Sequence, residues 1–386
     1  MALHLRRARC LEDGGGWSSP RDVRVGGGRV EAARPAGRGD LEVDLEGRFV
    51  LPALVNAHDV LDLSTLPPLG SPPYASLYEW TREAEADLAR LGPALAVPVV
   101  DRLFLGGLRN LLAGASAVLH HHPDHRSLSR ADFPVRVQGR YAFAHSPGLT
   151  PGLRRTYRTT DRRIPWVVRA AEGAAPELRF EIDALAAANV LRQNTVIVHG
   201  TALAPEDGAR LRAARASLVW CPESDRRLYG RTAPVAALIE AGVGVGLGSD
   251  APPTGARDPL SNLAAARREG VVDDRALLRL ATTGSAEVAR LPSGGFEGGA
   301  PADLLVVSSP ERLLEGDRLA VDLVLVRGVP VYGEPSLLAG AGGMVAPLSV
   351  DGGGRALAAP LGRRLAAILR RHPAARAASW LSGLAI

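Results

Sequence analysis

Short apolar stretches alternate with longer runs rich in Ala, Leu and Arg between residues 51 and 295. The apolar stretches predict buried strands, and the longer runs, such as 176–191 and 232–242, predict helices. The predicted strands include 116–122, 135–143, 165–172, 194–200, 216–222 and 243–250. Strands that alternate with helices are typical of parallel sheets built from β-α-β units. The pattern therefore predicts an α/β fold with a (β/α)8 TIM barrel over 51–295.

The two ends of the chain show a different pattern, in which short strands are separated by glycine-rich turns. This pattern covers residues 1–50 and returns over 296–349. We expect both ends to form one small β-sandwich domain, with the barrel inserted between them. Residues 350–386 are predicted to form a helical tail, because apolar residues recur there at helical spacing. These residues are Leu357, Leu361, Leu365 and Ile368.

The composition excludes several classes of protein and of site. Of 386 residues, 46% are hydrophobic and 23% are charged, as in an ordinary globular protein. The net charge is +5, but no basic tract occurs, so no nucleic-acid partner is expected. The sequence contains no lysine, which excludes a P-loop, a Schiff base and a carboxylated lysine between two metals. Cys10 and Cys221 are its only cysteines, which excludes a CxxC metal site.

The hydropathy pattern also bears on location. No uncharged apolar run of about 18 residues occurs, so neither a membrane span nor a membrane partner is expected. The N-terminal residues MALHLRRARC carry charge without an apolar core behind it. We therefore expect no signal peptide and a cytoplasmic protein.

Polar side chains stand where the predicted strands end, which is the edge at which parallel barrels build their active sites. Seven of the nine histidines lie between residues 58 and 199. Several histidines near a strand-end carboxylate are typical of a metal or acid–base site. The strand-end residues are Asn56, His58, Asp59, His120, His121, His122, His145, Arg169, Glu172, His199, Cys221, Glu223, Asp225 and Asp250.

These segments resemble the amidohydrolase superfamily, in the branch that includes chlorohydrolases and nucleobase deaminases. The matching segments are LPALVNAHDV, AAEG, TVIVHGTAL, LVWCPESDRRLYGRTAPVAALIEAGVGVGLGSDAPP and GGAPADLLVV, in family order from residue 51 to residue 307. The resemblance implies a metal-dependent barrel with a β-sandwich from both chain ends. It also implies a hydrolase that cleaves or deaminates a C–N bond of a small polar molecule, and a homo-oligomer.

The resemblance assigns metal ligands, but the set is incomplete. The family uses an H-x-H pair on the first strand, one histidine on each of the fifth and sixth strands, and an aspartate on the eighth. His58, His199 and Asp250 match this pattern and would hold one divalent transition metal, Zn or Fe. The second histidine of the pair falls on Val60 and the fifth-strand histidine on Arg169. Neither can replace a ligand, because Val has no donor atom and Arg is a permanent cation.

Three functions follow from this degenerate metal site. In the first, the protein is a hydrolase whose rebuilt site recruits a histidine of the run 120–122, with His122 as the fourth ligand. In the second, it is a metal-free enzyme in which the Arg169 guanidinium replaces the metal as the fixed positive charge and pairs with Asp250 or Glu172. In the third, it is a non-catalytic relative that keeps the pocket for binding.

The hydrolase hypothesis gives each residue a role. Asp250 is the general base, Glu172 the proton shuttle, and His199 a ligand or the group that polarises the reacting carbonyl or imine. Arg169 would bind an anionic part of the small-molecule substrate. His145 and Trp80 are predicted to contact the substrate, because they lie on segments that follow barrel strands. Alternation along a strand puts His120 and His122 on one face and His121 on the other.

Overall fold

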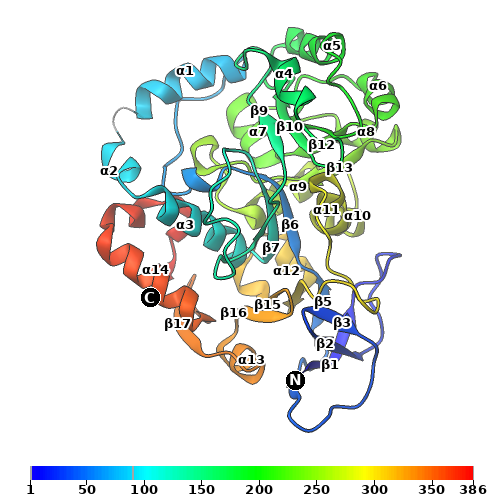
Figure 1. Ribbon diagram of the computed structural model, residues 1–386, viewed down its shortest axis with the longest axis vertical. Helices are drawn as coiled ribbons and strands as arrows, with labels where there is room; N and C mark the ends of the chain where they lie inside the picture. The colour runs from blue at the N-terminus through cyan, green and yellow to red at the C-terminus, as the bar shows by residue number, and fades with distance from the viewer. Residues whose placement is uncertain (1, 89–90, 386) are drawn as a thin grey trace.

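Eight parallel strands and the helices between them form the central part of the protein in the computed structural model (Figure 1). The structure describes residues 2–88 and 91–385. The eight strands are β6 (Leu54–Asp59), β7 (Ala115–His120), β8 (Arg136–Val137), β9 (Ala142–Ala144), β10 (Trp166–Ala170), β11 (Thr195–His199), β12 (Ser217–Trp220) and β13 (Gly244–Leu247).

The eight strands form two parallel ladders. One ladder has the order β6-β7-β8 and the other the order β13-β12-β11-β10-β9. A parallel bridge between Asp59 and Asp250 joins the ends of β6 and β13. Within the described ranges, no ladder pairs β9 with β8. The predicted α/β fold with parallel strands is confirmed, and the bridge brings the carboxyl ends of β6 and β13 together.

The helices of this central part largely follow the predicted pattern. They are α1 (Leu77–Leu88), α2 (Gly92–Leu95), α3 (Val99–Leu112), α4 (Leu153–Arg158), α5 (Phe180–Ala187), α6 (Asp207–Ala214), α7 (Pro222–Tyr229), α8 (Val235–Glu240), α9 (Pro259–Glu269), α10 (Asp274–Arg279) and α11 (Ser285–Ala289). The predicted strand 135–143 is two short strands, β8 and β9, because the chain bends at Gly139 and Arg140 between them.

Strands from both ends of the chain share one sheet of eleven strands. They are β1 (Leu3–Cys10), β2 (Arg21–Gly26), β3 (Arg29–Glu31), β4 (Leu41–Asp44), β5 (Phe49–Pro52), β14 (Leu304–Val307), β15 (Val321–Val326), β16 (Val329–Gly333), β17 (Val345–Val350), β18 (Gly353–Ala358) and β19 (Leu384–Ala385). The two ends meet where β5 pairs antiparallel with β14, with Val50 opposite Val306. The expected pairing of the chain ends is thus confirmed.

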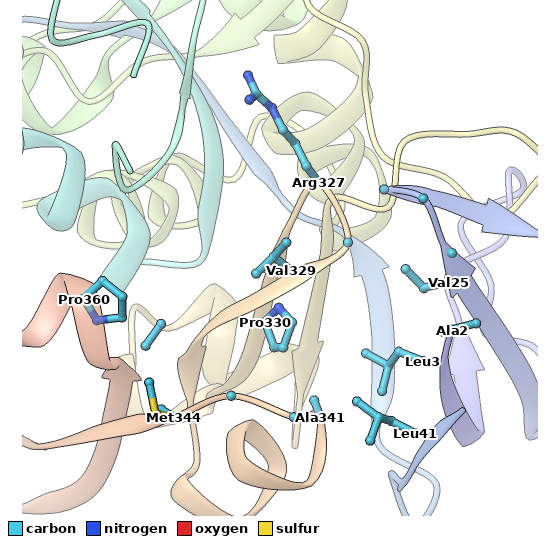
Figure 2. A pocket seen from close by; sticks show the side chains of 17 residues that line it. Ala2, Leu3, Val25, Leu41, Arg327, Val329, Pro330, Ala341, Met344 and Pro360 are labelled. Carbon is cyan, nitrogen blue, oxygen red and sulfur yellow. The ribbon is translucent and has the colours of Figure 1, made fainter. Parts of the chain in front are cut away.

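A groove lies on this sheet between strands of the two chain ends (Figure 2). Its volume is about 490 Å³. Leu3 and Leu41 line it from the N-terminal strands, and Val329 of β16 and Met344, which precedes β17, line it on the C-terminal side. The Arg327 side chain points away from these apolar groups in Figure 2. The wall of the groove is therefore mainly apolar.

The predicted helical tail contains both a helix and strands. The helix α14 spans Ala359–Arg371 and begins after Leu357, because residues 353–358 form β18 and pair with β17. Leu365 and Ile368 of α14 are buried. Arg364 lies over the Phe104 ring of α3, 4.0 Å from its centroid, and so docks α14 on the central part. The remaining helices are α12 (Pro310–Leu314) and α13 (Pro335–Gly340). Among the described residues, no helix is long and apolar enough to cross a membrane.

Candidate active site

His58, His199 and Asp250 meet at the carboxyl ends of β6, β11 and β13. Each of the three side chains is 0% exposed, and one donor atom from each lies within 4.8 Å of the others. Asp250 Oδ1 is 3.3 Å from His58 Nε2, and Asp250 Oδ2 is 3.4 Å from His199 Nε2. Neither Nε2 atom has a hydrogen-bond partner in the described structure. These three side chains therefore form a buried cluster of metal-type donors.

The backbone holds two of these residues in an uncommon conformation. His199 has a φ of 72° and Asp250 a φ of 53°, which is the left-handed region that non-glycine residues rarely adopt. The Asp250 amide donates to the His58 carbonyl at 3.1 Å. Arg109, buried on α3, donates to the Asp250 carbonyl at 3.1 Å. Strain of this kind persists where the surrounding fold fixes a functional side chain.

Asp225 of α7 orients His199 from behind. Its Oδ1 is 2.7 Å from His199 Nδ1, and its Oδ2 accepts a hydrogen bond from Thr232 Oγ1 at 2.9 Å. A carboxylate accepts, so Nδ1 carries a proton, and in the neutral ring Nε2 keeps a lone pair on the side of Asp250. The sequence pattern places Asp225 after a strand end but does not indicate this role.

Arg169 stands where the family has a histidine, and its guanidinium bridges two carboxylates. Its Nε and one terminal nitrogen each donate to Glu172 at 2.7 Å. Its two terminal nitrogens lie 3.4 and 3.3 Å from the two Asp250 oxygens. The Tyr229 hydroxyl also donates to Glu172, at 2.6 Å. Arg169 therefore pairs with both residues that the sequence suggested as alternatives.

Opposing effects set the charges of this cluster. Burial would raise the pKa of Asp250, but Arg169 and the two histidines hold it well below its usual range. Burial also opposes ionisation of Glu172, yet Arg169 and His199 lower its pKa below the ordinary value. Both carboxylates are therefore ionised at neutral pH.

Burial lowers the pKa of His58, which keeps that imidazole neutral. The pKa of His199 is raised, because Glu172 and Asp225 outweigh its burial.

The donors of His58, His199 and Asp250 fit a divalent transition metal. Two imidazoles and a carboxylate are typical ligands of Zn²⁺. With metal–ligand bonds of about 2.0–2.1 Å, neighbouring donors of a tetrahedral site lie about 3.4 Å apart. The two contacts of Asp250, at 3.3 and 3.4 Å, have that spacing but use its two different oxygens, and one donor atom of each residue lies within 4.8 Å of the others. The unpartnered Nε2 atoms are the observation that favours a metal ion here, because a buried ring nitrogen without a hydrogen-bond partner can offer its lone pair to a metal.

Gly248 lies next to His58 at a point with no room for a side chain. A Cβ there would be 2.5 Å from Val219 Cγ1 and 2.7 Å from His58 Cβ. At Gly246, two residues earlier, a Cβ would be 2.8 Å from the Ser285 Cα. The alternating glycines thus let β13 approach its neighbours closely.

Gly248→Ala is expected to displace His58 and to lower the free energy of unfolding by about 1–3 kcal/mol, because an inserted methyl group overpacks the contact. Gly244→Ala is the matched control, since a Cβ there meets Ser217 Oγ at an ordinary 3.4 Å. Urea denaturation of the two variants measures the difference. Equal stability of the two variants would show that the contact with His58 is not tight.

His122, which the sequence suggested as a fourth ligand, lies outside the cluster of His58, His199 and Asp250. Its Nδ1 lies 3.0 Å from Asp62 Oδ1, so Asp62 holds the ring outside the donor cluster. His120 lies beside His122, with ring centroids 6.0 Å apart. His121 points the other way, and its Nδ1 is 3.2 Å from His58 Nδ1. Of these three histidines, His121 is therefore the one whose side chain contacts His58.

A cavity of about 380 Å³ opens in front of Arg169. Trp80 and His145, the two residues that were predicted to contact a substrate, both line it. The Arg169 guanidinium carbon is 6.0 Å from the centroid of the Trp80 ring, and the Trp80 Nε1 is buried without a hydrogen-bond partner among the described residues. The other lining residues are Val60, Leu63, Leu77, Thr81, Glu85, His121, His122 and Leu149.

Sequence comparisons place the chain among characterised proteins. Residues 165–331 match the model of the amidohydrolase family. A 5-methylthioadenosine/S-adenosylhomocysteine deaminase of Halobacterium salinarum is 29% identical over 351 residues, which cover 74% of this chain and 81% of the relative. A protein of the same name from Haloquadratum walsbyi is 34% identical over 128 residues, which cover 31% of this chain and 29% of the relative.

Solved structures of related enzymes have the same fold. A zinc-bound adenosine deaminase from Xanthomonas campestris superposes with a TM-score of 0.70 at 19% identity, and covers 88% of this chain and 96% of its own. A mutant atrazine chlorohydrolase from Arthrobacter aurescens, complexed with zinc and atraton, also has a TM-score of 0.70, at 16% identity. That match covers 85% of this chain and 95% of the chlorohydrolase chain.

Proposed function

This chain belongs to the amidohydrolase superfamily, and we propose that it is a hydrolase that removes an amino group from a small polar heterocycle. The observation that carries the proposal is the meeting of His58, His199 and Asp250 beside the 380 Å³ cavity. Several relatives are named as deaminases of 5-methylthioadenosine and S-adenosylhomocysteine. An aminated purine nucleoside is therefore the substrate class that we propose.

The scaffold proposed for this activity is a closed (β/α)8 barrel with a β-sandwich. Eight parallel strands are the number in such a barrel, and the Asp59–Asp250 bridge already joins the two ladders. Leu5, Val50 and Leu304 share one buried cluster in the eleven-stranded sheet, which supports a sheet that folds over its own core.

We infer that His58, His199 and Asp250 hold one Zn²⁺ or Fe²⁺ ion. Three protein ligands with a further open position are the usual composition of a catalytic zinc site. When bound, the metal supplies a Lewis acid that lowers the pKa of water to about 7. Glu172 and Arg169 carry opposite charges and pair with each other beside the metal position. The bound ion would therefore balance the negative charge of Asp250.

Two carboxylates move the proton in this proposal. Asp250, ionised by its neighbours, accepts a proton from the attacking water. Glu172 lies beside the same nitrogen of His199 that Asp250 faces, with its Oε1 3.7 Å from His199 Nε2. Because Glu172 is ionised at rest, it first accepts this proton from Asp250. Glu172 then donates the proton to the leaving nitrogen. The water oxygen replaces the amino group on the ring carbon, and ammonia leaves with the proton.

A second candidate is a metal-free hydrolase, which one observation favours. Arg169 contacts both Asp250 and Glu172 and still presents 11% of its side chain to solvent at the cavity. In this alternative the Arg169 guanidinium is the fixed positive charge that stabilises a developing oxyanion. The two candidates differ in whether the reaction needs a metal.

The test measures ammonia released from adenosine, 5′-methylthioadenosine and S-adenosylhomocysteine. Protein stripped by a chelator should be inactive, and the same protein reloaded with Zn²⁺ or Fe²⁺ should release ammonia. Activity that persists in the stripped protein would favour the metal-free candidate. A failure to release ammonia from a wider panel of aminated purines and pyrimidines, with or without metal, would contradict the proposed deaminase.

A further inference from the structure

We propose that His121 is a positioning residue that fixes the tautomer of His58 and so directs the lone pair of His58 Nε2 toward the metal position. The inference rests on the proposed metal site and extends it to a residue outside the donor cluster. It follows from a chain of hydrogen bonds that starts at a main-chain carbonyl.

The first link fixes the proton on His121. Its Nε2 lies 3.2 Å from the carbonyl oxygen of Ala144, at the end of β9. A carbonyl oxygen accepts hydrogen bonds and cannot donate, so Nε2 of His121 carries a proton. The ring is 3% exposed and packs against His58 and Phe143. In the neutral ring, a proton on Nε2 leaves the lone pair on Nδ1.

The second link fixes the proton on His58. The Nδ1 atoms of His121 and His58 are 3.2 Å apart. Two ring nitrogens form a hydrogen bond only when one of them carries a proton, and His121 offers a lone pair at this atom. His58 Nδ1 is therefore the donor. The neutral His58 ring carries one proton, and that proton is on Nδ1. The Nε2 atom of His58 therefore keeps the lone pair that faces Asp250 at 3.3 Å.

The main chain holds His121 in register with His58. The His121 amide donates to the Asp59 carbonyl at 2.9 Å, which ties the end of β7 to the end of β6. The ring is thus anchored at its backbone and at its Nε2 atom. His199 receives the equivalent orientation from Asp225. The two imidazoles differ in that His58 is oriented by a neutral ring, which adds no negative charge to the site.

Metal titration of three variants tests the inference. His121→Phe keeps an aromatic ring but removes the acceptor, and is expected to weaken Zn²⁺ or Co²⁺ binding about 10–100-fold. His121→Asn places an amide oxygen near the former Nδ1 position and is expected to restore affinity close to that of the wild type. His372→Phe is the matched control, because His372 follows α14 and contacts Asp101, outside the residues that line the cavity. It should leave the affinity unchanged.

Nitrogen NMR of the metal-free protein provides a readout that does not need the metal. Wild-type His58 should show the Nδ1-protonated tautomer, and His121→Phe should shift His58 toward the Nε2-protonated form. Unchanged metal affinity and an unchanged tautomer in His121→Phe would overturn the inference and leave the proposed function intact. A wild-type protein that binds no metal would contradict the proposed function, and the His58 tautomer would still decide the inference.

Discussion

Asp250→Asn is expected to lower kcat/KM of the metal-loaded protein by about 10³–10⁴-fold. General-base catalysis alone contributes about 10²–10⁴-fold, and the amide is also a weaker ligand than the carboxylate. The amide retains the shape of the side chain, so the loss reports on charge and basicity. The measurements are the rate of ammonia release and the metal content of each purified variant.

Asp132→Asn is the control for this substitution. Asp132 forms an exposed ion pair with Arg130 and is not part of the donor cluster. The loss of this surface charge should leave the activity unchanged. If Asp250→Asn retained activity within about tenfold of the wild type, Asp250 could not be the general base. The same result would also argue against Asp250 as a ligand essential for the reaction.

Arg169→Met is expected to lower the free energy of unfolding of the metal-free protein by about 3–5 kcal/mol. Arg169 is the cation that contacts both Asp250 and Glu172, and its removal leaves two buried carboxylates without this partner. A bound divalent ion would offset part of the loss, because it brings positive charge to Asp250. Urea denaturation with Zn²⁺ and with a chelator should therefore give different losses for this variant.

Arg163→Met is the matched control for the loss of Arg169. Arg163 pairs with Asp161 at the surface with 85% of its side chain exposed, and such pairs contribute less than about 1 kcal/mol. A loss below about 1 kcal/mol for Arg169→Met would contradict the buried pairing that the structure shows.

The parallel strands and the donor cluster could be predicted because they follow from local pattern and from one rule of architecture. The apolar runs mark buried strands, and the carboxyl ends of parallel strands meet at one edge. His58, His199 and Asp250 each stand at such an end, so their meeting required no knowledge of side-chain contacts. The resemblance to a known family added the expectation that they bind a metal.

Other features depended on tertiary contacts that the sequence does not specify. The choice between His121 and His122 depends on where β7 ends and on Asp62, which holds the His122 ring. The role of Asp225 depends on how α7 packs beside β11. The sequence suggested that Arg169 pairs with Asp250 or Glu172, and the contact with both depends on the positions of three separate segments.

The location of a bound ion tests the central claim most directly. Anomalous scattering at the zinc edge, measured on crystals of the zinc-loaded protein, gives that location. The account predicts one peak per chain, about 2.0–2.2 Å from His58 Nε2, His199 Nε2 and an Asp250 oxygen. The absence of a peak there, or a peak only at the histidine run 120–122, would contradict the account.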